Sequence, residues 1–418
     1  MDWGTYFALS KVFGGSGGGG GGTTADSKAV NFIDYDGTIL YSYTAADALA
    51  LTELPANPSN TGLTAQGWNW SLANIKTYLT KYPDSIVNVG QMYTTDDGKT
   101  RLYIYIDDDT PANRMTFYVR FTASTSDNTT IDWGDGTSEV KGSTSETDYA
   151  HTYASTGHYT ITLTVNSGTI SFTGTSGSAE YAIYGSTSTS YSYNRGRIRK
   201  VEIGNNVTNI ENYAFYNCYS LTSITIPDSV TSIGGNAFYY CYSLTSITIP
   251  DGVTSIVGST FLACHSLTSI TIPDDVTSIG NSAFYNCYSL TSITIPDSVT
   301  SIGNSAFYYC YSLTSITIPD GVTSILGSTF QACHSLTSIT IPDGVTSIAS
   351  SAFYNCYAVG EYHLLPNTPP TLSKNAFTGI ASDCIIYVPY SADHSILNAY
   401  KTATKWSNYA SQMQEEPQ

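Results

Sequence analysis

The sequence predicts a multidomain chain whose largest part is a solenoid, preceded by a small α+β domain and a β-sandwich. A 23-residue unit, clear at Ser220 to Tyr242, recurs with almost no drift, and a fixed period of this length is typical of a solenoid. Seven cysteines from Cys218 to Cys356 lie 23 residues apart, each three residues after a Phe. Ahead of this array the hydrophobic pattern changes twice, which indicates two further domains.

Residues 1–29 are expected to form a short amphipathic helix and a linker. Trp3, Phe7 and Phe13 are spaced for one face of a helix, and Gly14 to Gly22 form a flexible polyglycine run. The segment has an early Asp and neither a basic start nor a long apolar run, so it lacks the pattern of a secretory signal peptide. No stretch of the chain approaches the ~18 consecutive apolar residues of a membrane span, so we expect no membrane insertion.

Residues 30–110 mix strand and helix patterns, which predicts a small α+β domain. Thr44 and Ser71 are placed to cap helices, and Asp97-Gly98 is a signal for a hairpin turn. The expected elements are strands Val30 to Ile33 and Thr38 to Tyr43, helices after Thr44 and Ser71, and a hairpin over Tyr93 to Ile106.

A motif with catalytic potential lies between the first two strands. Asp34-Tyr35-Asp36-Gly37-Thr38 resembles the DxDGT motif of haloacid-dehalogenase-like phosphatases, which implies Asp34 as a nucleophile and Asp36 as an acid or base. Those enzymes need a doubly wound α/β domain that supplies a Lys and further Asp residues, and only about seventy residues remain before the sandwich. The sequence therefore favours a non-enzymatic chain without catalytic residues, and a phosphatase is the alternative from another class.

Residues 111–180 are expected to form the β-sandwich. Strand patterns at Thr116 to Phe121 and Tyr159 to Val165 are separated by turn-rich residues. The stretch Ile131 to Thr137 holds a Trp-Gly-Asp-Gly turn, and His151-Thr152-Tyr153 and Gly157-His158-Tyr159 follow it. In this order the three segments resemble the PKD domain family, and the resemblance implies an immunoglobulin-like spacer in a surface-exposed protein.

Residues 195–360 hold the seven repeats. In the second complete unit, Ile247 and Ile249 alternate with Thr248 in a strand that Pro250 ends, and Asp251-Gly252 turns the chain. The apolar positions that must face the interior of this unit are Leu244, Ile247, Ile249, Val253, Ile256, Phe261 and Cys264.

The pattern L-x-x-I-x-I-P-x-x-V-x-x-I-x-x-x-A-F-x-x-C closely resembles the leucine-rich repeats of BspA-like bacterial surface proteins. The resemblance implies a leucine-rich repeat solenoid with one β-strand and an irregular coil in each repeat. Residues 361–410 are expected to cap its open end, with Ser391 capping a helix that runs through Tyr400.

The charge balance excludes nucleic acid as a partner. The chain has 33 acidic and 16 basic residues, and no Lys or Arg lies between Val201 and Ser373. Such a surface repels phosphates and has few cations with which to release their counterions.

Two repeated side chains have alternative interpretations. The spaced cysteines lie among Ile, Phe and Leu, so we expect buried reduced thiols, although neighbours could pair or bind a metal. The Asp after each Pro is expected to form a turn, and the alternative is a Ca²⁺ ion held between coils. We predict neither a metal site nor a cofactor. The Asp positions are Asp228, Asp251, Asp274, Asp297, Asp320 and Asp343.

The residue after each spaced cysteine is aromatic, and these residues are the candidate ligand-binding site. This aromatic row consists of Tyr219, Tyr242, His265, Tyr288, Tyr311, His334 and Tyr357. Aromatic rings on a rigid, weakly charged surface suit sugar rings or a protein partner, because they offer contact area with little loss of entropy. Alternatively, the rings cover the edge of the solenoid and stack on one another.

These observations predict a non-enzymatic protein that attaches to a cell surface, with a bacterial or host protein or a glycan as its partner. The short helix and polyglycine of residues 1–22 resemble the start of bacteriophage tail-associated structural proteins, which implies a virion protein that contacts other tail components through its N-terminus. The repeats and the PKD-like domain imply an exported bacterial adhesin instead. The expected location is therefore a virion or the cell surface.

Overall fold

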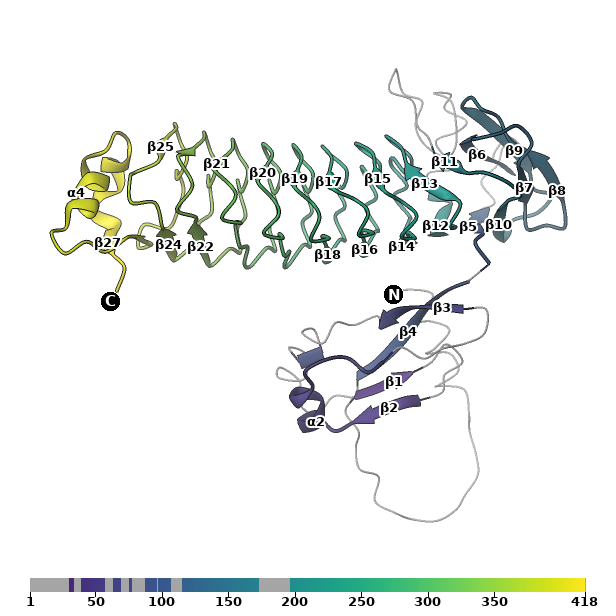
Figure 1. Ribbon diagram of the computed structural model, residues 1–418, viewed down its shortest axis with the longest axis horizontal. Helices are drawn as coiled ribbons and strands as arrows, with labels where there is room; N and C mark the ends of the chain where they lie inside the picture. Colours follow the sequence, from purple (N-terminus) through teal and green to yellow (C-terminus); the bar gives the residue numbers. More distant parts are fainter. Residues whose placement is uncertain are drawn as a thin grey trace, which may run out of the picture. The chain divides into compact units, whose positions relative to one another are not determined.

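The computed structural model describes residues 30–33, 39–56, 63–68, 75–76, 87–95, 97–106, 115–172 and 196–417. The chain divides into two compact units, Met1–Gly98 and Lys99–Gln418 (Figure 1). The N-terminal helix and polyglycine run, the acidic motif at Asp34 and Asp36, and most of the helix expected after Ser71 lie outside the described residues.

The first unit contains a sheet in the strand order β2-β1-β4-β3. Its strands are β1 (Val30–Ile33), β2 (Ile39–Tyr43), β3 (Leu63–Trp68) and β4 (Val87–Thr95). Strand β1 is antiparallel to β2 and parallel to β4. Helix α2 (Ala45–Ala50) begins after Thr44, whose hydroxyl accepts a hydrogen bond from the Asp47 amide at 3.2 Å, so the predicted cap is confirmed.

The predicted hairpin over Tyr93 to Ile106 is wrong. Strand β5 (Thr100–Ile106) pairs with strands of the second unit, whereas β4 pairs with β1 and β3. The turn signal is present, because Gly98 has a φ of +66°. A turn motif shows that the chain reverses, but it does not determine which strand the next segment pairs with. Here β5 belongs to the second unit, because its alternating residues Leu102, Ile104 and Ile106 are buried in the core of that unit.

The second unit begins with the predicted β-sandwich. Its further strands are β6 (Thr116–Ala123), β7 (Thr129–Asp132), β8 (Ser138–Lys141), β9 (Thr147–Thr152), β10 (Gly157–Val165) and β11 (Ile170–Phe172). Trp133 is buried, its ring stacks on His151 at 5.0 Å, and its carbonyl accepts a hydrogen bond from the Tyr153 hydroxyl. The Trp-Gly-Asp-Gly turn and the His-x-Tyr segment therefore form one packed corner.

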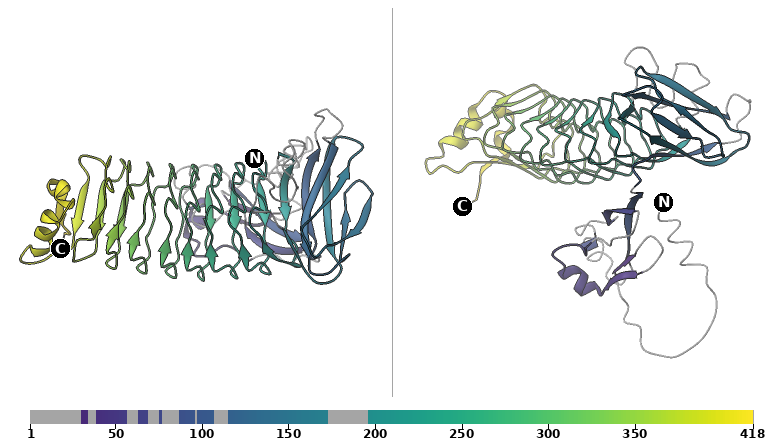
Figure 2. Two further views of the ribbon diagram at one scale, coloured as in Figure 1. Left: turned by 90° about the horizontal axis from the view of Figure 1, so that it is seen from above. Right: turned by 45° about the vertical axis from the view of Figure 1, so that its right-hand side comes forward.

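The sandwich continues directly into the solenoid. Strands β12 (Ile198–Glu202) and β14 (Ser223–Thr225) extend one of its sheets, in the order β14-β12-β5-β10-β7-β8. Strands β13 (Val207–Ile210) and β15 (Ser232–Ile233) extend the other, in the order β15-β13-β11-β6-β9. The sandwich therefore covers the open N-terminal end of the solenoid and shares its hydrophobic core (Figure 2).

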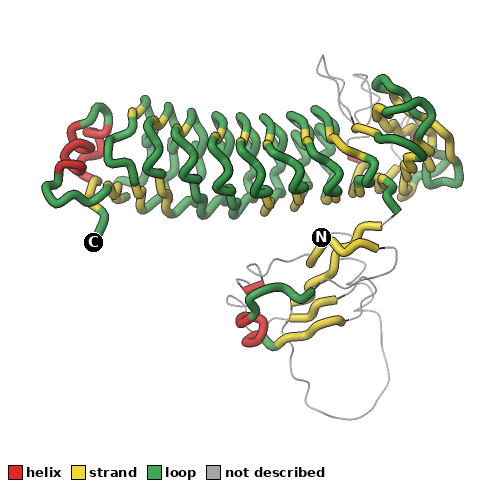
Figure 3. Tube along the Cα trace, in the orientation of Figure 1, coloured by secondary structure: helices red, strands yellow, loops and turns green. Residues whose placement is uncertain are grey.

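The solenoid has about nine turns. The coils contain mostly turns and loops with short strands (Figure 3). On one side the strand is reduced to isolated bridges at Ser292, Thr294 and Ser315. The strands are β16 (Ser246–Thr248), β17 (Ser255–Ile256), β18 (Ser269–Thr271), β19 (Ser278–Ile279), β20 (Ser301–Ile302), β21 (Ser324–Ile325), β22 (Ser338–Ile341) and β23 (Ser347–Ile348). Strands of successive coils are parallel and in register, with Ile247 opposite Ile270 and Ile256 opposite Ile279. The second short strand of each coil was not predicted.

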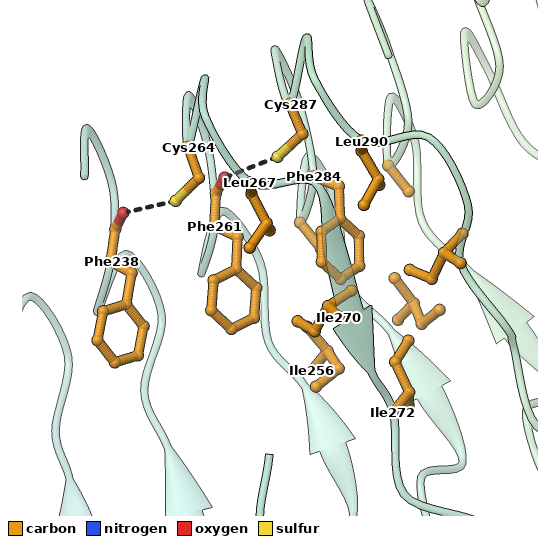
Figure 4. Close-up of a cluster of buried hydrophobic side chains, with 14 of the residues drawn as sticks. Phe238, Ile256, Phe261, Cys264, Leu267, Ile270, Ile272, Phe284, Cys287 and Leu290 are labelled. Atoms are coloured by element: carbon orange, nitrogen blue, oxygen red, sulfur yellow. Dashed lines mark hydrogen bonds between the residues drawn. The ribbon is translucent and has the colours of Figure 1, made fainter. Parts of the chain in front are cut away.

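The interior of the solenoid is formed by repeated side chains. The phenylalanine rings of successive coils are stacked, with centroid distances of 5.5 Å from Phe238 to Phe261 and from Phe261 to Phe284 (Figure 4). The Cys264 thiol donates a hydrogen bond to the Phe238 carbonyl of the preceding coil at 3.3 Å, and Cys287 donates to Phe261 in the same way. Each coil thus buries its apolar residues against its neighbours, as expected for a solenoid.

The C-terminal end is closed by one more irregular coil and a helix. The elements are β24 (Glu361–Leu364), β25 (Thr371–Leu372), β26 (Ile385–Val388), α4 (Ser395–Thr402), the 3₁₀ helix η4 (Trp406–Gln412) and β27 (Met413–Glu415). Trp406 is buried and lies 5.4 Å from the ring of Phe377, which continues the phenylalanine stack. The helix begins later than predicted, and the Ser391 hydroxyl accepts a hydrogen bond from the Ile396 amide.

Candidate binding surface

The outward-facing surface of each coil is set by a tight segment that ends at the cysteine. In the coil of Cys287, Ser282 and Asn286 have φ angles of 55° and 60°, in the left-handed region. Between them, Phe284 points into the core while Tyr285 stays half-buried at the surface. The Phe284 amide donates to the Ala306 carbonyl of the next coil at 2.8 Å, so each segment is held against its neighbour.

The aromatic row is a continuous stack over most of its length. Ring centroids lie 4.5 Å apart from Tyr242 to His265 and from His265 to Tyr288, and 5.1 Å apart from Tyr288 to Tyr311. The stack continues through His334 to Tyr357, at 4.7 and 4.4 Å. Six of the seven predicted site residues are therefore brought together as one column of rings.

The rings of this column remain accessible to solvent. Tyr242 is 36% exposed and Tyr357 is 54% exposed, while the members between them are half-buried. Tyr219, which is 41% exposed, lies over Gly196, where any side chain would collide with its ring. The geometry thus shows the mutual stacking that the edge-covering interpretation expects, and every ring of the column remains partly exposed.

A second set of tyrosines lies beside the aromatic row, two residues before the cysteines. Tyr216 stacks on Tyr239 at 5.1 Å, and Tyr285 stacks on Tyr308 at 4.7 Å. The Tyr308 hydroxyl also accepts a hydrogen bond from the Gln331 side chain of the next coil at 3.2 Å.

Two tyrosines that sequence reasoning missed join these two sets. Tyr240 lies 4.1 Å from Tyr239 and 5.4 Å from Tyr242, and Tyr309 has equivalent neighbours in its own coil. The signal that could have found them is the Tyr-Tyr-Cys-Tyr sequence, which occurs at Cys241 and again at Cys310.

Both histidines and two of the tyrosines on this surface are held in their uncharged forms. Burial lowers the pKa of His265 and of His334, which keeps both rings uncharged within the stack. Burial and a hydrogen bond with Tyr240 raise the pKa of Tyr239, and burial raises the pKa of Tyr242. Such a surface is suited to an uncharged ligand.

The spaced cysteines are buried and hydrogen-bonded, and the aspartates after each proline lie in turns. Burial raises the pKa of Cys287, and six of the spaced thiols donate hydrogen bonds to phenylalanine carbonyls one coil away. The Asp251 position lies in a β-turn closed by the Val253 amide, which donates to the Pro250 carbonyl at 3.0 Å. In the part of the chain that the structure describes, no group of three or more His, Cys, Asp or Glu side chains is placed to hold a metal ion.

The fold and the repeated side chains define a capped repeat protein of the leucine-rich type. A family model described as "BspA type Leucine rich repeat region" matches residues 187–313 and 300–401 in six copies, and a PKD domain model matches residues 113–171. The chain belongs to the BspA-type leucine-rich repeat family. Proteins with these repeats are typically cell-surface proteins of adhesion and recognition, and both domain types are typically non-enzymatic binding modules.

Several solved structures are similar to the chain. A leucine-rich repeat protein from Bacteroides ovatus is 27% identical with a TM-score of 0.42, and the match covers 52% of this chain and 58% of that one. The Treponema pallidum leucine-rich repeat protein is 29% identical with a TM-score of 0.34, covering 41% and 74%. A leucine-rich cell surface protein from Faecalibacterium prausnitzii is 26% identical with a TM-score of 0.24, covering 50% and 83%.

No curated protein matches the chain. None of the helices in the described ranges has the length and hydropathy that crossing a bilayer requires.

Proposed function

We propose that this chain is a non-enzymatic attachment protein whose solenoid binds a partner on a target cell through the aromatic row. The observation that carries the proposal is the column of stacked rings from Tyr242 to Tyr357, which is partly exposed and lies on coils that contain no cationic side chain. Stacked rings on a rigid backbone lose little conformational entropy when they bind, so their contact area is converted efficiently into affinity.

The finer proposal is that the protein works on a bacteriophage particle. It is supported by residues 1–22, in which a short apolar segment is followed by a polyglycine linker. Such a segment is suited to docking into other tail components. The alternative is an exported bacterial adhesin, which the repeat family favours. Finding the chain in purified phage particles by mass spectrometry supports the virion setting, and finding it on bacteria that carry no phage supports the adhesin.

The binding proposal is tested by measuring attachment of the full-length protein to target cells. Aromatic contacts at the centre of an interface commonly contribute about 2 kcal/mol or more each, so the double variant Tyr288→Ala/Tyr311→Ala should attach at least tenfold more weakly. Changing the salt concentration should alter the affinity little, because the row is uncharged.

The matched control is Tyr390→Ala, because Tyr390 is 46% exposed and lies in the C-terminal cap rather than in the row. Attachment of the double variant at wild-type strength would place recognition elsewhere in the chain.

A further inference from the structure

The solenoid presents the same arrangement of four tyrosines twice. The first tyrosine cluster consists of Tyr216, Tyr239, Tyr240 and Tyr242, and the second consists of Tyr285, Tyr308, Tyr309 and Tyr311. The edge-to-face contact from Tyr239 to Tyr240 measures 4.1 Å, and its equivalent from Tyr308 to Tyr309 measures 4.0 Å. The next contact in each cluster, to the ring after the cysteine, measures 5.4 and 5.3 Å.

The backbone at the centre of each cluster is unfavourable for tyrosine. Tyr240 and Tyr309 have φ angles of 62° and 61°, in the left-handed region, where bulky residues are rare. The same position in the other coils has the same backbone with Asn or Ala: Asn217, Ala263, Asn286, Ala332 and Asn355. The coil therefore folds without a ring at this position, so the fold does not require the tyrosines at the centre of the two clusters.

The chemistry of the clusters points to an uncharged ligand. The acidic residues of these coils lie at the Pro-Asp turns, beyond the following strand, apart from Glu211 in the first coil. Burial and the hydrogen bond with Tyr309 raise the pKa of Tyr308, so the second cluster stays neutral, as does the first. Aromatic faces next to phenol hydroxyl groups complement a sugar, which has an apolar face and hydroxyl groups at its edge.

The spacing of the clusters points to a ligand that itself repeats. They are 69 residues apart, which is three coils, and stacked strands are separated by about 4.8 Å, so the clusters lie roughly 14 Å apart on one surface. The coils between them remain in register, with Ser278 opposite both Ser255 and Ser301. A polymer of identical units can contact both clusters at once.

We infer that the two tyrosine clusters are duplicate binding sites for one neutral polysaccharide with a repeating unit, a proposal that rests on the attachment function above. Engaging two linked sites raises avidity by roughly 10² to 10⁴ over a single site, provided that the ligand spans both. Long chains should therefore bind far more tightly than short oligosaccharides of the same sugar.

The test uses the full-length protein and an array of neutral glycans that includes short and long chains of each type. The variants are Tyr240→Asn, Tyr309→Asn and the double variant, because Asn already occupies this position at Asn217, Asn286 and Asn355. Tyr390→Asn is the matched control, since it removes an exposed tyrosine from the cap. Each protein is also tested for attachment to target cells that have been treated with protease or with glycosidases.

The expected result is that the wild type binds at least one neutral polysaccharide, each single variant binds the long chain at least 100-fold more weakly because one of the two linked sites is lost, and the double variant binds neither the long nor the short chain. With the short oligosaccharide, a single variant should keep its affinity and bind half as much ligand. Glycosidase treatment of the cells should abolish attachment, and Tyr390→Asn should behave as the wild type.

Three results would overturn the inference: no binding to any neutral glycan, full binding by the double variant, or attachment that protease removes and glycosidases do not. If Tyr288→Ala/Tyr311→Ala nevertheless weakens attachment, the proposed function survives and only the glycan ligand is wrong. If neither pair of substitutions has an effect, both proposals fail.

Discussion

The inner and outer sides of the segment around each spaced cysteine follow different periods. The inner side repeats every 23 residues, with Phe and Cys in every coil from Phe215 to Cys356. The outer side repeats every 69 residues, which is three coils. The two residues before the cysteine are Tyr-Asn in one coil, Tyr-Tyr in the next and Leu-Ala or Gln-Ala in the third, and the order then starts again. An inner side chain must pack against an identical neighbour above and below, whereas an outer side chain contacts solvent and is free to vary.

The largest expected contrast is between two adjacent residues, Phe284 and Tyr285. Phe284→Ala should lower the free energy of unfolding by roughly 3 to 5 kcal/mol, because its ring is fully buried between those of Phe261 and Phe307 and the coils cannot close the cavity. Tyr285→Ala should cost no more than about 1.5 kcal/mol, the scale of one aromatic pair, since Tyr285 is half-buried on Tyr308. Denaturant unfolding of the two variants measures both values, and equal losses would refute the distinction between the two sides.

The cysteines sharpen the description of the inner side. Burial raises the pKa of Cys356 to about 12 from an ordinary value of 9.0, because the core disfavours the thiolate. Native protein should therefore react slowly with a thiol reagent even at pH 9, and denatured protein should react at all eight cysteines. Detection of Cys241 linked to Cys264 by mass spectrometry would contradict a reduced inner side.

The same shift has a consequence for stability. A thiol whose folded pKa lies above its unfolded pKa stabilises the fold fully below pH 9, and this contribution is lost as the pH rises toward 12. Denaturant midpoints measured between pH 8 and pH 11 should fall with increasing pH, and Cys356→Ala should reduce that slope. A midpoint that is independent of pH over this range would show that the thiols are not buried as described.

Much of the inner side could be predicted from the sequence, because burial imposes a period. The spacing of Ile, Val, Phe and Cys identified the core positions, and the aromatic row was found because it shares the period of the cysteines. The second strand of each coil, such as Ser255–Ile256, was missed because two residues are too few to show alternation. Tyr240 was missed because its backbone is in the left-handed region, and this conformation cannot be predicted from a tyrosine in the sequence.

The ends of the solenoid were less predictable than its middle. The continuation of the sandwich sheets into the first coil depends on the pairing of β5 with β12, whose residues are about a hundred positions apart. Nothing local in either strand specifies such a partner, whereas pairing between coils follows directly from the repeat.

The smallest expected effect concerns the outer side. Burial lowers the pKa of His265 below its ordinary value of 6.5, so its neutral form favours the fold above that pH and the contribution is lost as the pH falls below it. His265→Tyr, which installs the residue found at this position in five other coils, should reduce the loss of stability between pH 7 and pH 5 by a small amount. Thermal midpoints at the two pH values measure this, and an unchanged difference would show that the ring is solvated rather than stacked.

The central claim is that the outer aromatic row contacts the target, and hydroxyl-radical footprinting of the full-length protein bound to target cells tests it most directly. Oxidation of Tyr242, Tyr288, Tyr311 and Tyr357 should fall on binding, while oxidation of Tyr390 in the cap should stay the same. If the row is oxidised in the bound protein as strongly as in the free protein, the aromatic row does not contact the target. Recognition then lies elsewhere in the chain, and the proposed binding role of the row is wrong.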